Sequence, residues 1–336
     1  MQPVPAARPV LVAPDSFKGT LTAAQVADAL ERGLREAGWR CDRCPAADGG
    51  DGTLDVLLAT LGGELVETDA HDPLGRPIRA VFAMIHGARA VVETATASGL
   101  ALVPERERDA EAASTAGTGQ LIAAAVRSGA REVLLGVGGS ATTDGGAGAI
   151  EAIEASGGLG GARLVVLCDV RTPFERAAEV FAPQKGADPE AVRRLARRLA
   201  RQARALPRDP RGLAMTGCAG GLSGGLWAAF GARLVPGAAF VLDALGFDAR
   251  ALPAAAVVTG EGRLDAQSLE GKVVGEVATR CRQRGIPCHA VVGRSILDRF
   301  GRRLLDLQSV DEAGTAEEIE ATAMRLGERL AAERSR

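Results

Sequence analysis

The chain has 336 residues, is 46% hydrophobic and 24% charged, and carries a formal net charge of −2. This composition can form a large core in one or two domains, and it excludes a wholly disordered protein. The near-neutral charge, the absence of tyrosine and an aromatic content of only 3% argue against nucleic-acid binding.

The first nine residues are proline-rich and contain no apolar run, so we expect no signal peptide. No apolar stretch approaches the ~20 residues needed to span a bilayer, so we expect no membrane association. Cys41 and Cys44 form a C-x-x-C pair, but no second pair lies at a zinc-ligand spacing. We therefore expect reduced thiols without a metal or redox role, and a cytoplasmic protein.

Short apolar runs alternate with helical patterns along the chain. Residues 10–13 predict a strand, and apolar residues at helical spacing follow from Thr22 to Gly38. The same order of strand and glycine-rich loop returns at residues 131–137, 254–258 and 288–292. This alternation predicts a parallel sheet covered by helices, with ligands bound beyond the carboxyl ends of its strands.

Three other stretches depart from this alternation of strands and helices. Residues 64–92 predict antiparallel strands, residues 188–205 an arginine-rich helix, and residues 217–231 are rich in glycine and small apolar residues. We interpret these as parts of a second, smaller α/β domain inserted into the first, with the active site in the cleft between them. The predicted parallel-sheet domain comprises residues 1–62, 115–150 and 240–336, and the inserted domain comprises residues 63–114 and 151–239.

Only three of the 40 basic residues are lysines: Lys18, Lys185 and Lys272. Each lies beside a glycine in a polar segment. Lysine differs from arginine in being a compact point charge, which suits phosphate binding. Chance retention in turns is the alternative for any single lysine, but the three together point to an enzyme that handles anions.

The first two glycine-containing loops combine charges with backbone amides. Asp15, Ser16 and Lys18 lie between a strand and a helix, where amides and the ammonium can face one anion. Asp48 and Asp51 surround glycines, and carboxylates of this kind suit Mg²⁺ together with phosphate oxygens. Helix capping is the simpler explanation for the threonines near these loops, and it remains an alternative for Asp51.

Two further loops carry the same signature. Residues 136–148 place Gly138, Gly139, Ser140, Thr142 and Asp144 between a strand and a helix, a composition typical of phosphate loops. Its pattern fits neither the Rossmann nor the P-loop motif. The fourth loop joins Gly260, Glu261, Gly262, Arg263 and Asp265 to Lys272. Arg263 can hold a carboxylate or phosphate bidentately, or it can form a structural pair with a neighbouring carboxylate.

These motifs occur together in a recognisable order. The segments PDSFKG (14–19), DGGDGT (48–53), GGSATTDGGAG (138–148) and GEGRLD (260–265), with FAPQKGA (181–187) and GCAGGLSGGL (217–226), resemble the glycerate kinase family that includes the bacterial glycerate 2-kinases. The chain departs from that pattern at Asp51, where glutamate is expected, at Thr143, where asparagine is usual, and in residues 168–174. The resemblance implies a flavodoxin-like domain interrupted by a second α/β domain.

The activity implied by the resemblance is phosphorylation of D-glycerate with ATP and Mg²⁺, giving 2-phosphoglycerate and ADP. We expect Lys18 to act on the transferring phosphoryl group, Asp48 and Asp144 to bind Mg²⁺ or take the hydroxyl proton, and Arg263 to hold the carboxylate. The full expected set is Gly138, Gly139, Ser140, Thr142, Gly260, Gly262 and Lys272 for ATP, Asp15, Ser16, Arg263 and Lys185 for the substrate, and Asp48, Asp51, Glu261 and Asp265 for the metal.

Several alternatives remain open from the sequence. Transfer to the C3 hydroxyl would give 3-phosphoglycerate. A Mg²⁺-dependent phosphatase or phosphomutase with an aspartyl nucleophile would not require ATP. A non-enzymatic regulator that binds sugar acids is a third alternative, although no helix-turn-helix or basic patch supports it. The sequence also leaves a homodimer open.

Overall fold

The computed structural model describes residues 8–334. Residues 1–7, for which we expected no signal peptide, and residues 335–336 lie outside the described residues. The chain divides into two compact units. One unit is built from two segments of the chain, the first ending at Asp48 and the second beginning at Ala238, and we call it the split unit. The other unit is Gly49–Gly237, and we call it the inserted unit. Each is described by itself below.

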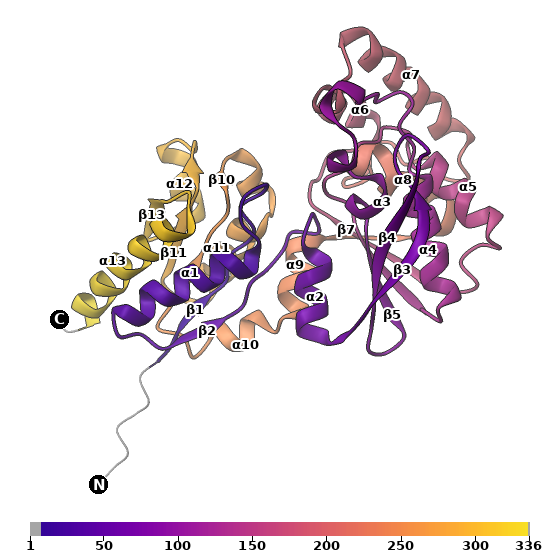
Figure 1. Cartoon of the computed structure of the whole chain (residues 1–336). Helices are drawn as coiled ribbons and strands as arrows, with labels where there is room; N and C mark the ends of the chain where they lie inside the picture. The colour runs from indigo at the N-terminus through magenta and orange to yellow at the C-terminus, as the bar shows by residue number, and fades with distance from the viewer. Residues whose placement is uncertain (1–7, 335–336) are drawn as a thin grey trace. The chain divides into compact units, whose positions relative to one another are not determined.

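The split unit contains a parallel sheet of five strands in the order β2-β1-β9-β11-β13. Figure 1 labels β1, β2, β11 and β13 of this sheet. Numbered within the unit, this order is 2-1-3-4-5, the order of flavodoxin. The three central strands, β1, β9 and β11, are short and fully buried, as expected for a sheet covered on both faces, whereas the edge strands β2 and β13 are more polar and only partly buried. Their bounds are β1 (Val10–Val12), β2 (Cys41–Arg43), β9 (Ala256–Thr259), β11 (Cys288–Val292) and β13 (Ser309–Glu312).

Helices complete the split unit. Capping was expected for a threonine before the first helix, Thr20 or Thr22, and the structure shows that Thr22 is the N-cap, in a capping box with Gln25. That helix packs along the C-terminal helix, and a Cβ on Gly33 would lie 2.0 Å from the Glu320 carbonyl oxygen, so only glycine permits this approach (Figure 1). The helices are α1 (Ala23–Glu36), α9 (Gly237–Ala244), α10 (Phe247–Ala251), α11 (Val273–Arg284), α12 (Arg299–Leu305) and α13 (Ala316–Arg334), and a small parallel pair is formed by β10 (Arg263–Leu264) and β12 (Arg294–Ser295).

The inserted unit contains a mixed sheet of six strands in the order β3-β4-β5-β6-β7-β8. The predicted antiparallel stretch is confirmed, because β3 pairs with β4 and β4 with β5 in antiparallel fashion. The remaining pairs are parallel. The strands are β3 (Gly63–His71), β4 (Pro77–Ile85), β5 (Arg89–Glu93), β6 (Glu132–Gly136), β7 (Arg163–Cys168) and β8 (Arg233–Pro236).

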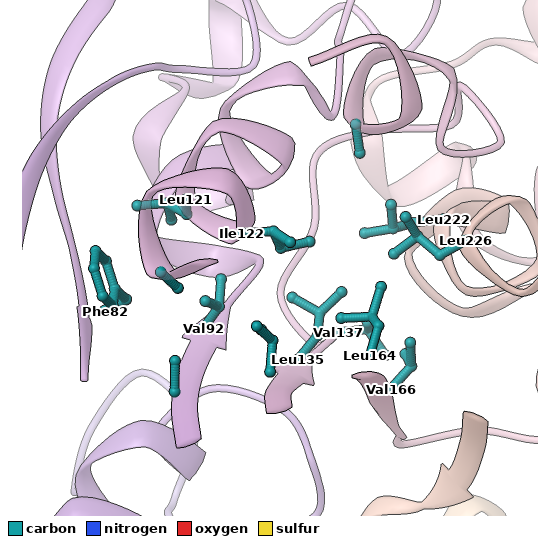
Figure 2. Packing of buried hydrophobic residues seen from close by; sticks show 14 of the residues in the cluster. Phe82, Val92, Leu121, Ile122, Leu135, Val137, Leu164, Val166, Leu222 and Leu226 are labelled. Atoms are coloured by element: carbon teal, nitrogen blue, oxygen red, sulfur yellow. The ribbon is translucent and has the colours of Figure 1, made fainter. Parts of the chain in front are cut away.

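The core of the inserted unit lies between this sheet and its helices. Figure 2 shows Leu121 and Ile122 of one helix above Val92 and Leu135 of the strands, with Leu222 of a second helix beside them. Full burial of each such side chain contributes roughly 1.5–3 kcal/mol. The helices are α2 (Thr53–Leu61), α3 (Ala95–Ser98), α4 (Ala116–Arg127), α5 (Ala147–Ala155), α6 (Ala177–Phe181), α7 (Pro189–Ala205) and α8 (Cys218–Phe230).

The structure confirms the α/β class with parallel sheets, but the division of the chain differs from the predicted one. Residues 115–150 were expected in the flavodoxin-like domain, whereas β6 lies between β5 and β7 in the sheet of the inserted unit. Residues 49–62 also belong to the inserted unit, which is the larger of the two rather than the smaller. The physical reason is that a strand followed by a phosphate-type loop looks the same in either sheet, and only long-range pairing decides between them. Within residues 8–334, no helix is both long and apolar enough to cross a membrane.

Candidate active site

A cavity of about 570 Å³ opens at the carboxyl ends of β1 and β9 in the split unit. Strands β1 and β9 are neighbours in the sheet. The strand that follows β1 in sequence, β2, lies on the far side of β1, whereas the strand that follows β9 in this sheet, β11, lies on the far side of β9, so the strand order reverses between β1 and β9. Ligands of open α/β sheets bind at such a reversal of strand order. The cavity is lined by Asp15, Ser16, Phe17, Lys18, Thr20, Asp48, Glu261, Gly262, Arg263, Asp265, Gln267, Lys272, Gly293, Arg294 and Gly314. The first, second and fourth predicted loops therefore contribute to one cavity.

Backbone contacts hold the first loop against the fourth. The Asp15 N–H donates to the Gly260 carbonyl oxygen at 2.8 Å, and the Thr259 hydroxyl donates to the Ala13 carbonyl oxygen at 2.8 Å. A Cβ on Gly262 would lie 3.2 Å from the Phe17 Cα, so a side chain there would require the first loop to move by a few tenths of an ångström. These contacts bring Lys18 and Arg263 to the same cavity, although 245 residues separate them in sequence.

Three carboxylates are buried in the cavity wall. Asp15, Asp48 and Glu261 are exposed by only 5%, 3% and 5%. Burial, and then the negative charge of Asp48, raise the pKa of Asp15 well above its usual value. Burial raises the pKa of Glu261 to about 7, although a hydrogen bond from Ser268 at 2.5 Å and the charge of Lys272 oppose the shift. This wall therefore concentrates negative charge that a cation or a proton would neutralise.

The donor set of this wall fits a divalent cation held partly by substrate oxygens. Within residues 8–334, no three His, Cys, Asp or Glu side chains converge on one point as a closed metal cage. Mg²⁺ does not require such a cage, because it commonly takes one or two carboxylates plus phosphate oxygens and water. Burial, and after it the negative charge of Asp48, raise the pKa values of Asp15 and Glu261, and this concentration of buried carboxylates favours a cation beside Asp48 and Glu261.

Basic side chains complete the cavity. Arg263 is 65% exposed, and its Nε lies 3.1 Å from the Asp265 Oδ2. Asp265 also accepts a hydrogen bond from the Gln267 N–H at 2.9 Å, so it caps the short helix that follows. Lys272 is the N-cap residue of α11. Arg294 lines the same cavity but was missed in the sequence analysis, although Gly293-Arg294 repeats the Gly262-Arg263 pair.

The third loop lies in the inserted unit and encloses Lys185. The Lys185 ammonium is only 2% exposed and donates to the Ser140 hydroxyl at 3.0 Å and to the Thr142 carbonyl oxygen. Burial lowers the pKa of Lys185 to about 7, although the negative charges of Asp144 and Asp169 oppose the shift. The structure thus brings together Lys185, Ser140 and Thr142, and the ammonium is used to hold the loop.

The Asp144 carboxylate also holds the third loop, through hydrogen bonds. It is 1% exposed, and its Oδ2 accepts hydrogen bonds from the Thr115 N–H at 2.9 Å and hydroxyl at 2.8 Å. The N–H groups of Gly146 and Gly148 donate to the same carboxylate, each at 3.1 Å. These bonds tie the start of α5 to the start of α4, which is a structural use of the side chain.

The second loop lies against the third within the inserted unit. A Cβ on Gly138 would lie 2.3 Å from the Gly50 Cα, and one on Gly139 would lie 2.2 Å from the Asp51 Oδ1. Gly139 also has a φ of +66°, which favours glycine. Glycines in the third loop therefore allow the second loop to pack on it. The Asp51 side chain is exposed there, whereas Asp48 lines the cavity of the split unit.

Glu93, at the end of β5, is a buried acid that the sequence analysis missed. It is 8% exposed and accepts a hydrogen bond from the Leu54 N–H, at the start of α2, at 2.7 Å. Burial raises its pKa to about 7, with the charges of Asp51 and Asp55 contributing. No local pattern marks it, because an acid that ends a strand is ordinarily exposed.

Comparison with known proteins identifies the family. The model of the glycerate kinase family matches residues 10–158 and 153–310. The Escherichia coli K12 glycerate 2-kinase is 36% identical over 330 residues, covering 87% of this chain and 86% of that protein. The Halalkalibacterium halodurans glycerate kinase is 37% identical over 324 residues, covering 84% and 85%. A crystal structure of a putative glycerate kinase 2 from Salmonella typhimurium LT2 matches with a TM-score of 0.82 at 33% identity, covering 98% of this chain and all of that one. The chain therefore belongs to the glycerate kinase family of phosphotransferase enzymes.

Proposed function

We propose that the protein transfers the γ-phosphoryl group of ATP to the C2 hydroxyl of D-glycerate, with Mg²⁺, and releases 2-phosphoglycerate and ADP. The observation that carries the proposal is the cavity of the split unit, where lysines, arginines and buried carboxylates meet at the carboxyl ends of β1 and β9. Phosphoryl transfer depends mainly on positioning and charge neutralisation, and this set of side chains supplies both.

Within that cavity we assign separate roles to the charges. Lys18 stabilises the transferring phosphoryl group, while Lys272, at the start of α11, and the backbone of Gly260 and Gly262 bind phosphate oxygens. Arg263 holds the glycerate carboxylate, and Asp15 and Ser16 line the substrate side.

We assign the three buried carboxylates of the cavity to two roles, metal binding and proton transfer. Asp48 and Glu261 are the residues that would hold Mg²⁺, which supplies charge neutralisation on the phosphate oxygens when it is bound. Asp15 accepts the proton from the glycerate hydroxyl, because a carboxylate with a raised pKa is a better base near neutral pH. Asp265 orients Arg263 through their 3.1 Å ion pair.

The loop of the inserted unit supports nucleotide binding. Gly138, Gly139, Ser140 and Thr142 would contribute to phosphate binding. The buried hydroxyls of Thr142 and Thr143 have no hydrogen-bond partner within residues 8–334, which is unusual and favours a ligand there. We assign Lys185 and Asp144 to holding this loop, in place of the substrate contact and catalytic role expected from the sequence. Asp51 remains a proposed metal-side residue.

Two further points of the proposal depend on the relatives and on composition. The Escherichia coli relative is named a glycerate 2-kinase, which supports transfer to C2. If Arg263 holds the carboxylate, the C2 oxygen is also the hydroxyl closest to that anchor. The six cysteines are all free thiols, which supports a reducing compartment, the cytoplasm.

The test measures ADP release with D-glycerate and then couples the product to enolase without phosphoglycerate mutase. Immediate formation of phosphoenolpyruvate is expected, because enolase uses 2-phosphoglycerate. A strict requirement for the mutase would show that the product is 3-phosphoglycerate. Release of phosphate from a phosphorylated glycerate without ATP, through an aspartyl phosphoenzyme that hydroxylamine cleaves, would support the phosphatase alternative and overturn the kinase assignment.

A further inference from the structure

Two arginines lie side by side at the cavity of the split unit. Strands β10 and β12 pair in parallel with Arg263 in register with Arg294, and both residues line the cavity. Paired strands lie about 4.8 Å apart, and in-register side chains project from the same face of the pair. The structure therefore places two guanidinium groups close enough together to contact the same anionic group of a ligand.

The backbone enforces this arrangement. The Gly293 N–H donates to the Glu261 carbonyl oxygen, and the Arg294 N–H donates to the Gly262 carbonyl oxygen, both at 3.0 Å. A Cβ on Gly293 would lie 2.5 Å from the Gly262 carbonyl oxygen, so only glycine permits the strands to approach this closely. The position of Arg294 is thus a built feature of the cavity rather than a chance orientation of an exposed loop.

The two charges are unequally compensated. Like charges on neighbouring strands repel one another. Arg263 is paired with Asp265 at 3.1 Å, whereas Arg294 is exposed and forms no salt bridge with any side chain in residues 8–334. An anion bound between the two guanidinium groups would remove this repulsion.

We propose that Arg294 is a substrate-binding residue that, together with Arg263, holds the carboxylate of the organic-acid substrate. This inference rests on the proposed function, which it deepens by naming a second carboxylate-binding residue. The planar guanidinium fork matches a planar carboxylate bidentately, whereas the lysines of the cavity, Lys18 and Lys272, are point charges suited to phosphates. Arg294 thus selects substrates that carry a carboxylate.

The test is calorimetric binding of D-glycerate and, separately, of ADP to the full-length protein. We expect Arg294→Gln to weaken D-glycerate binding by about tenfold or more, the scale for losing one charge-assisted contact, and to leave ADP binding within about twofold. Arg294→Lys keeps the charge but not the fork and should be intermediate. Arg299→Gln, which changes an exposed arginine outside the cavity, is the matched control and should bind both ligands like wild type.

Equal affinity of wild type and Arg294→Gln for D-glycerate would overturn the inference. So would a selective loss of ADP binding, which would assign Arg294 to a phosphate, and so would a wild-type protein that binds no D-glycerate. Failure of the proposed function is seen separately, in the product assay. If D-glycerate binds through Arg294 but no 2-phosphoglycerate forms, the inference stands and the proposed reaction does not.

Discussion

Replacement of Glu93 by glutamine should make the inserted unit less sensitive to pH. Glu93 is buried, and its pKa of about 7 lies above the ordinary value of 4.5. The folded state therefore holds the proton more tightly than the unfolded state. The stability that this provides is fully present below pH 4.5 and is lost as pH rises through 7. At 1.36 kcal/mol per pKa unit, the loss is about 3 kcal/mol.

The glutamine variant keeps an oxygen that can accept the hydrogen bond from the Leu54 N–H, but it cannot ionise. We expect it to match wild type near pH 4.5 and to exceed wild type in free energy of unfolding by about 3 kcal/mol at pH 8. Urea unfolding can be followed in a shared Trp39→Phe background, where the fluorescence of Trp227 reports on the inserted unit alone.

Glu154→Gln, which changes an exposed carboxylate on α5, is the control and should follow the wild-type curve at every pH. The reasoning is refuted if Glu93→Gln and wild type differ by the same free energy at pH 5 and at pH 8. That result would mean that the burial of Glu93 does not favour its protonated form.

Substitutions at Lys18, at Asp48 and at the Cys41 and Cys44 pair test the site and the cysteines, and a substitution at Lys185 tests the buried lysine. Lys18→Arg should lower kcat about tenfold or more and Lys18→Ala about 10²–10³-fold, the scale for losing one preorganised charge; a fully active Lys18→Arg would contradict its role. Asp48→Asn should weaken Mg²⁺ dependence or abolish turnover with the thermal midpoint within a few degrees of wild type, whereas unfolding would show a structural role. Serine at both Cys41 and Cys44 should leave activity intact, and elemental analysis should find no stoichiometric zinc. In the wild type, the free energy of unfolding of the inserted unit should rise between pH 7 and 10.5, because the folded Lys185 has lost its proton there whereas the unfolded one has not. Lys185→Met should remove this rise, and a rise that persists in the variant would contradict the lowered pKa of Lys185.

Sequence patterns located the elements and most of the loops that matter. Apolar runs predicted β1, β9 and β11, and apolar residues at helical spacing predicted a helix from Thr22, the residue that caps α1. These signals are local, because a strand needs a few apolar residues and a cap needs one hydroxyl beside a backbone amide. Glycines beside charged residues likewise predicted the loops that line the cavity.

The tertiary structure decided which elements share a sheet and which side chains face a ligand. Residues 115–150 carry the same local pattern as the flavodoxin-like strands, but β6 pairs with β5 and β7. Lys185 lies beside a glycine in a polar segment, as expected for a phosphate-binding lysine, yet its ammonium is buried against Ser140. Arg294 becomes a cavity residue only because Gly293 lets its strand approach Gly262. Pairing and burial are long-range properties, so residue type and local spacing by themselves determined where this chemistry could occur, and packing determined which side chains are placed to perform it.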